Sequence, residues 1–159
     1  MKRKENPGFT LIEILVVVVI LGLLAALVVP QFTNNTKDAM QQAFIYDVKT
    51  FASAAEYYRA KTGEYLEDSS SGQCPSGWEN YVDVARWESL TPLGGVWDFE
   101  NNENGILSGF GVDFSNGEGS DRDDAYMREI DAKMDDGNLS SGQFRKIANG
   151  RYYYVIADL

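Results

Sequence analysis

One carboxylate stands inside a long apolar stretch near the start of the chain. Glu13 is followed by an unbroken apolar run at residues 14–29. An ionised carboxylate at the depth of a lipid bilayer costs roughly 2.5–3.5 kcal/mol on insertion scales, so we expect it to have a function and a partner. Cleavage between Gly8 and Phe9 would create that partner, because the new α-amino group of Phe9 would lie one helical turn before Glu13. The two charges could then pair within one chain or between neighbouring copies.

The residues around this carboxylate form a specific signal. A short basic leader ends in glycine, FTLIE follows at residues 9–13, and the apolar segment closes on PQF. Over residues 2–32 this arrangement closely resembles the class III signal of type IV pilins and type II secretion pseudopilins. The resemblance implies that a prepilin peptidase cuts between Gly8 and Phe9 and that the Phe9 amine is then methylated. It also implies that Glu13 reads the register of subunits during filament assembly.

The distribution of charge limits both the partners and the orientation of the chain. The formal net charge is −10, and no nucleic-acid partner is expected because phosphate binding requires clustered Lys and Arg. The basic residues before the apolar segment are Lys2, Arg3 and Lys4. Basic residues before the segment and acidic residues after it predict a cytoplasmic N-terminus in the inner membrane, with the C-terminal domain in the periplasm or outside the cell.

The apolar segment is predicted to remain in the mature protein as a single membrane pass. A secretory signal would carry a small-residue cleavage site after its apolar region, and residues 28–32, VVPQF, contain none. Residues 9–29 match the roughly 20 residues that cross the hydrocarbon core of a bilayer. Gly22 and the neighbouring Ala25 and Ala26 would let other helices approach closely.

Beyond Pro30 the apolar residues keep a helical spacing. They are Met40, Phe44, Val48, Phe51, Ala55 and Tyr58. Steps of three and four residues predict an amphipathic helix that continues the apolar one to about Lys61 and ends at Gly63. Pro30 stands inside this continuous pattern, so we expect a kink or local unwinding there, which either marks the membrane exit or serves assembly.

The remaining pattern predicts a small sheet and a late helix. In chain order we expect a polar loop at residues 68–77, a short helix or irregular segment at 78–90, strands at 92–99 and 106–114, a helix opened by a capping box of Ser120 and Asp123, and a strand at 151–157. The late helix should point Tyr126, Met127, Ile130 and Met134 inward and end at Gly137.

The fold class is therefore α+β and pilin-like, with a long N-terminal helix packed on a small antiparallel sheet. The membrane-spanning half of this helix precedes its amphipathic half. We expect a leader peptide at residues 1–8, a transmembrane or filament-core helix at 9–30, and an extracytoplasmic globular domain at 31–159. The amphipathic half of the helix, about 31–61, belongs to this domain.

The residue types argue against an enzyme. The chain has no histidine, which excludes Ser-His-Asp and Cys-His nucleophiles and His-ligated zinc. Its single cysteine, Cys74, can form no intrachain disulfide, and it is either a bystander thiol or an intermolecular partner. Many type IV pilins carry a cysteine pair, so this departure favours pseudopilin-like proteins and other disulfide-free pilins. The acidic residues between positions 121 and 136 are interpreted as a solvated face rather than a catalytic carboxylate pair.

Calcium is the one cofactor that the sequence indicates. A loop containing glycine carries Asp113, Asp121, Asp123 and Asp124, and hard cations bind carboxylate and carbonyl oxygens. The spacing does not fit an EF-hand, and it does not match the late calcium loop of major pseudopilins residue by residue. The alternative is a helix N-terminus enriched in acids that favour the helix dipole.

The leading functional hypothesis is a structural subunit of a type II secretion pseudopilus or a type IV pilus-like filament. Its partners would be copies of itself or other pilin-like subunits, the prepilin peptidase, an inner-membrane assembly platform and membrane lipid. The alternative is a membrane-anchored extracytoplasmic module that binds a cation or a protein and forms no filament. Processing by a prepilin peptidase would separate the two.

Overall fold

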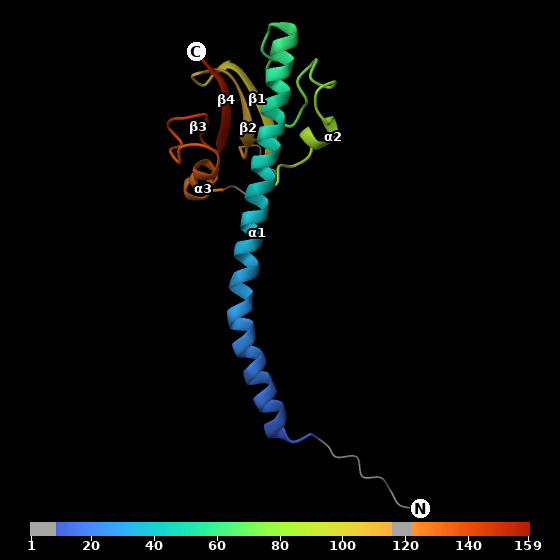
Figure 1. Ribbon diagram of the computed structural model, residues 1–159, viewed down its shortest axis with the longest axis vertical. Helices are drawn as coiled ribbons and strands as arrows, with labels where there is room; N and C mark the ends of the chain where they lie inside the picture. Colours follow the sequence, from blue (N-terminus) through green and yellow to red (C-terminus); the bar gives the residue numbers. More distant parts are fainter. Residues whose placement is uncertain (1–8, 116–121) are drawn as a thin grey trace, which may run out of the picture. The chain divides into compact units, whose positions relative to one another are not determined.

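The computed structural model describes residues 9–115 and 122–159, apart from the side chains of residues 27 and 29–34. Its elements are α1 (Leu11–Thr62), α2 (Val84–Trp87), β1 (Val96–Glu103), β2 (Ile106–Asp113), α3 (Asp124–Met134), β3 (Phe144–Ala148) and β4 (Arg151–Asp158) (Figure 1). The chain divides into an N-terminal unit, Met1–Ala39, and a C-terminal unit, Met40–Leu159. Helix α1 contributes residues to both units.

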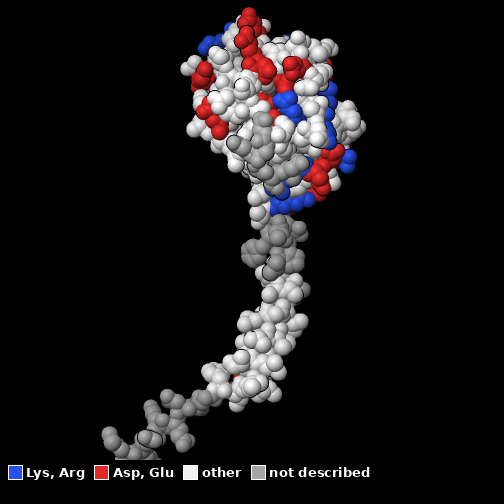
Figure 2. Space-filling model, turned by 180° about the vertical axis from the view of Figure 1, so that it is seen from behind, with Lys and Arg blue, Asp and Glu red and all other residues white. Residues whose placement is uncertain are grey.

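The described part of the N-terminal unit is an apolar helix without a covered face. Its large apolar side chains between Leu11 and Leu24 are each at least 50% exposed. Figure 2 shows this surface as almost entirely uncharged. Within the described part of the chain, no helix combines the length and the apolar character needed to cross a membrane.

Helix α1 is assigned without a break through Pro30, whose side chain lies outside the described residues. The kink or unwinding expected at Pro30 therefore stays a prediction. At the other end the helix stops at Thr62, and Gly63 follows with a φ of 81°. A left-handed residue just after a helix is a common C-terminal cap and favours glycine. The predicted end of the amphipathic half is confirmed.

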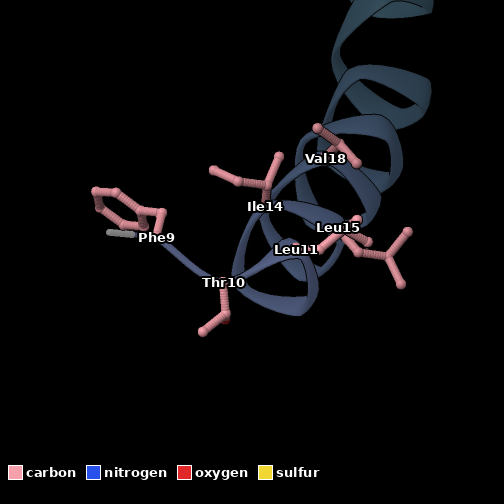
Figure 3. Close-up of a pocket in the computed structure, with 6 residues that line it drawn as sticks. All are labelled: Phe9, Thr10, Leu11, Ile14, Leu15 and Val18. Atoms are coloured by element: carbon pink, nitrogen blue, oxygen red, sulfur yellow. The ribbon is translucent and has the colours of Figure 1, made fainter. Parts of the chain in front are cut away.

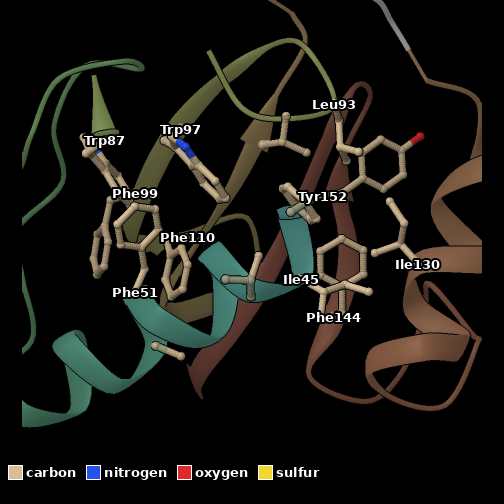
Figure 4. Close-up of a cluster of buried hydrophobic side chains, with 14 of the residues drawn as sticks. Ile45, Phe51, Trp87, Leu93, Trp97, Phe99, Phe110, Ile130, Phe144 and Tyr152 are labelled. Carbon is tan, nitrogen blue, oxygen red and sulfur yellow. The ribbon is translucent and has the colours of Figure 1, made fainter. Parts of the chain in front are cut away.

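The C-terminal unit buries one face of α1 against the sheet. Phe44, Val48, Phe51 and Ala55 of the predicted apolar stripe are at most 5% exposed, whereas Met40 is 37% exposed. The rest of this core is rich in aromatic residues and comes from all four strands, α2, α3 and the loops between them, as Figure 4 shows for part of the cluster.

Phe51 lies at the centre of this aromatic core. Its ring centroid is 5.0 Å from those of both Trp87 and Trp97, and it also meets Trp78 and Phe110 edge-on or tilted. Such pairs contribute about 0.5–1.5 kcal/mol each beyond their buried area. The packing of α1 on the sheet therefore depends strongly on this one side chain.

The sheet is antiparallel with strand order β1-β2-β4-β3. Strands β1 and β2 meet across Asn104-Gly105, both with positive φ, as in a two-residue hairpin turn. Gly111 in β2 is required by close packing, because a Cβ there would overlap the carbonyl oxygen of Tyr152 in β4. The predicted α+β, pilin-like arrangement of a long helix on a small antiparallel sheet is confirmed.

Three details of the sequence interpretation were wrong. Strand β3 was not predicted, because its five residues, FRKIA, show no alternation of polar and apolar side chains and form a strand by pairing with β4. Strand β1 begins at Val96 rather than at residue 92. Helix α3 begins later than expected: its N-cap is Asp123, whose side chain accepts from the Tyr126 N–H, rather than Ser120.

Candidate functional site

The start of α1 is closed by a capping box. Thr10 stands before the first helical residue, and both its backbone N–H and its hydroxyl donate to Glu13 Oε2 at 2.7 Å. The Glu13 N–H points back toward the Thr10 hydroxyl oxygen at 3.3 Å. A threonine followed three residues later by glutamate satisfies the first free N–H groups of a helix reciprocally. Glu13 is thus held by its own chain at the helix start.

Phe9 precedes this box and lies outside the helix. Its side chain is 83% exposed, and it lines two shallow apolar hollows on the surface of α1. One is lined with Ile14 and Val18 among others (Figure 3), and the other includes Glu13. Phe9 and Ile14 occupy the positions of a hydrophobic staple, in which the residue before the cap packs near the fourth helical residue.

The predicted pairing of Glu13 with the Phe9 amine requires cleavage after Gly8, and the structure describes the uncleaved chain. Gly8 lies outside the described residues, and Phe9 is still in peptide linkage, so the observed partner of Glu13 is Thr10 rather than an amine. Sequence reasoning missed Thr10, although T-x-x-E before an apolar run is a known signal of a helix start. The pairing of Glu13 with a processed Phe9 stays a prediction.

Asp113, the first residue nominated for calcium, belongs to a buried ion-pair network. Arg151 binds Asp98, lies 2.5 Å from Glu100 Oε1, and has its Nε 3.6 Å from Asp113 Oδ2. All three carboxylates are at most 3% exposed, and burial raises the pKa of Glu100. Asp113 also accepts hydrogen bonds from Ser71 and Ser115.

The other carboxylates predicted to bind calcium also accept hydrogen bonds from the protein itself, where the structure describes them. Asp123 caps α3. Asp124 accepts from Lys146 Nζ at 2.7 Å and from the Tyr152 hydroxyl, and these hydrogen bonds lower its pKa. Asp121 lies outside the described residues. The described residues of this loop therefore do not gather into one group of carboxylates, and calcium binding there stays a prediction.

A different acidic group does gather, at the end of α3. One carboxylate oxygen from each of Asp131, Asp135 and Asp136 lies within 4.8 Å of the others. The interpretation of these residues as a solvated face was wrong for Asp131, which is 0% exposed. Burial, followed by the nearby charges of Asp136 and Asp135, raises the pKa of Asp131 to about 6.

Cys74 is a free, partly buried thiol. Burial, followed by the charges of Glu79 and Glu88, raises its pKa to about 11. Because the thiolate is the reactive form of cysteine, this environment makes Cys74 a poor nucleophile.

Comparisons with known proteins single out the N-terminal part of the chain. Residues 3–29 match the family model of the prokaryotic N-terminal methylation motif. The type II secretion system core protein G of Pseudomonas aeruginosa is 48% identical over 65 residues, which are 41% of this chain and 46% of that protein. The core protein G of Aeromonas hydrophila is 40% identical with the same coverage, and that of Escherichia coli K12 is 41% identical over 61 residues, covering 38% and 42%.

The chain thus matches less than half the length of each of these relatives. No solved structure matches it.

Proposed function

Since this chain belongs, through its N-terminal segment, to the type IV pilin and type II secretion pseudopilin family, we propose that it is a structural subunit of a type II secretion pseudopilus or a related pilus-like filament. In this proposal the precursor sits in the inner membrane with its C-terminal unit outside the cytoplasm. A prepilin peptidase removes residues 1–8, the Phe9 amine is methylated, and an assembly platform adds the subunit to the filament. No catalytic activity is expected.

The observation that carries the proposal is the uncovered apolar surface of α1. Contiguous apolar surface of this kind marks a binding site for lipid or protein. Before assembly, lipid would cover the large side chains between Leu11 and Leu24. In the filament, the same segments of neighbouring subunits would cover one another, and Gly22, which has open space around its Cβ position, would allow close helix approach. Repeated contacts between two different faces build an open helical filament.

The capping box supports a specific role for Glu13. Thr10 holds Glu13 Oε2 through two hydrogen bonds, so the carboxylate is already oriented when a partner approaches. Once Gly8 is removed, the Phe9 amine of an adjacent subunit would supply a positive charge. Pairing of the two would remove an isolated charge from the apolar surroundings of the filament core.

Processing by the peptidase tests the proposal directly. Co-expression of the chain with a prepilin peptidase should shorten it by the leader of eight residues. Gly8→Val should block this step, because a branched side chain obstructs a protease pocket that accepts glycine. The matched control is Gly22→Val, where no atom lies within 4 Å of the added Cβ, and it should be processed normally. N-terminal sequencing that finds Phe9 at the start of the Gly8→Val product would contradict the assignment.

A further inference from the structure

A buried group of charged side chains lies on the face of the sheet opposite α1. Trp97 and Phe99 of β1 belong to the aromatic core beneath α1. Because side chains alternate along a strand, Asp98 and Glu100 lie on the other face. Both carboxylates are at most 3% exposed. The C-terminal unit therefore buries charge on the side of the sheet that α1 does not cover.

Two glycines of β2 leave room for this group. Gly111 pairs with Asp98 in β1 and with Tyr153 in β4. Gly109 lies in the same way between Glu100 and β4. Since neither glycine has a side chain, groups from β1 and β4 can meet across β2, and the Tyr153 hydroxyl donates to Asp98.

The charges of the group do not balance. Arg151 of β4 binds Asp98, and its Nη1 lies 2.5 Å from Glu100 Oε1. Its Nε lies 3.6 Å from Oδ2 of Asp113, which the Ser115 N–H also holds through Oδ1 at 2.7 Å. The other ion pairs among the described residues bring no second cation to these carboxylates. One guanidinium thus faces three buried carboxylates.

Glu100 is the carboxylate with too few partners. Its Oε2 is buried and has no hydrogen-bond partner among the described residues. Burial raises the pKa of Glu100, and the charge of Arg151 offsets this only in part. The negative charges of Asp98, Asp68 and Glu103 raise the pKa further. A buried carboxylate in such surroundings is neutralised by taking up a proton.

The segment before the sheet is attached along the edge of β1, an outer strand. The Gly72 N–H donates to the Trp97 carbonyl oxygen at 2.7 Å. Asn101 Nδ2 donates to the Leu66 carbonyl oxygen, also at 2.7 Å. Asp68 lies between these two attachments in the chain, and burial raises its pKa as well. An acid of the attached segment therefore shares the excess of negative charge at this edge.

We propose that Glu100 is a proton-binding site of the C-terminal unit, and that loss of its proton weakens the attachment of residues 66–72 to β1. One guanidinium and three carboxylates carry a net charge of −2, and the proton reduces it to −1. The protonated carboxyl can keep its contact with Arg151 through Oε1. The ionised form adds an uncompensated charge that repels Asp68.

The sign of the effect on stability follows from the raised pKa. Folding takes up a proton, because the folded chain holds it more tightly than the unfolded chain does. This contribution to stability is fully present below the ordinary glutamate pKa of 4.5. It is lost as pH rises through the raised pKa of the folded state.

Infrared titration of the full-length chain in detergent tests the proposal. The spectrum of wild type minus that of Glu100→Gln should contain the band of a protonated carboxyl group at about pH 5. This band should convert to that of a carboxylate as pH rises to about 8, with a midpoint above 4.5, the ordinary value for glutamate. A midpoint at or below 4.5 would overturn the proposal.

Unfolding followed by tryptophan fluorescence measures the effect on stability, since the three tryptophans are buried in the C-terminal unit. From about pH 4 to about pH 8, the unfolding constant of wild type should rise at least about threefold relative to that of Glu100→Gln, because the amide cannot ionise. Other acids are common to both chains and cancel in this ratio. The matched control Glu67→Gln, at an exposed position, should follow the wild type. A ratio that does not change with pH would contradict proton uptake by Glu100.

Hydrogen exchange in the wild-type chain locates the change. The protection factor of the Gly72 N–H should fall at least about threefold from about pH 5 to about pH 8, because local opening of the segment becomes easier. The Gly63 N–H, which donates to the Arg59 carbonyl oxygen at 2.8 Å at the end of α1, should keep its protection factor. In Glu100→Gln the fall at Gly72 should be smaller. A constant protection factor at Gly72 in the wild type would overturn the proposed weakening.

Discussion

Two stretches of one helix differ in how their apolar side chains are covered. Between Leu11 and Leu24 the large apolar side chains are at least half exposed, and valines alone range from 50% to 54% exposed. From Phe44 to Ala55 the same helix buries a narrow stripe against its own sheet, where Val48 is 0% exposed. The apolar side chains of the second stretch are covered by other residues of the same chain. The first requires cover from outside it, which is why the proposed assembly function belongs to that stretch.

The largest expected effect is on assembly and comes from Glu13→Ala. This variant should be processed and should unfold like the wild type, yet give little or no filament, because the Phe9 amine of a neighbour would lose a buried partner at a cost of about 3–5 kcal/mol. Filament yield from cells carrying the assembly machinery measures the effect. Glu13→Asp, with a shorter reach, should give a partial defect.

Thr10→Val sharpens this test, because it removes the hydroxyl donor to Glu13 but keeps the carboxylate. Its filament yield should lie between those of wild type and Glu13→Ala. A wild-type yield for Glu13→Ala would refute the role of Glu13.

Phe51→Ala should produce the largest loss of stability in the C-terminal unit. Truncating a buried aromatic ring costs about 3–5 kcal/mol, and Phe51 touches four other aromatic rings. Chemical denaturation followed by tryptophan fluorescence measures the change in unfolding free energy. Tyr57→Ala on the exposed face of the same helix, where Tyr57 is 60% exposed, should change it far less. Similar losses for the two variants would contradict the described packing.

A matched pair of valines compares the two stretches directly. Val48→Ala should lower the unfolding free energy of the C-terminal unit by about 2 kcal/mol, through lost burial and a small cavity. Val18→Ala removes the same atoms from a side chain that is 53% exposed, so the unfolding free energy should stay within about 0.5 kcal/mol of wild type. The position of the valine, rather than its type, decides the outcome. Equal losses of unfolding free energy in Val48→Ala and Val18→Ala would contradict the described difference in burial between the two stretches.

Asp131→Asn should change the unfolding free energy in the opposite direction, by less than Phe51→Ala does. The folded-state pKa of Asp131 is raised from 3.8 to about 6, so its ionisation makes the folded chain less stable as pH rises from about 4 to about 6. With chelator present at pH 7, the amide should therefore raise the unfolding free energy by about 1–2 kcal/mol. Below pH 4 the gain should vanish. A destabilised Asp131→Asn at pH 7 in chelator would show that Asp131 already has a partner of positive charge.

The features that the sequence predicted well depend on near neighbours along the chain. Three such features are the signal at residues 9–13, the apolar stripe from Phe44 to Ala55 and the helix end at Gly63. Each depends on residues three to five positions apart, and such spacing can be recognised in the sequence because a helix places these residues on one face. The cap formed by Thr10 is equally local and was within reach of the same reasoning.

Only the tertiary structure decided the features that depend on distant residues. Strand β3 exists because β4 supplies its hydrogen-bond partners, and polar residues such as Arg145 and Lys146 give no strand signal of their own. The sequence predicts that Asp131 lies on a solvated polar face of its helix, but the fold buries this residue completely. Arg151 meets Asp98, Glu100 and Asp113 only when three strands align. Burial and long-range pairing are properties of the packed chain, because each side chain's surroundings are supplied by residues that its own sequence neighbourhood does not contain.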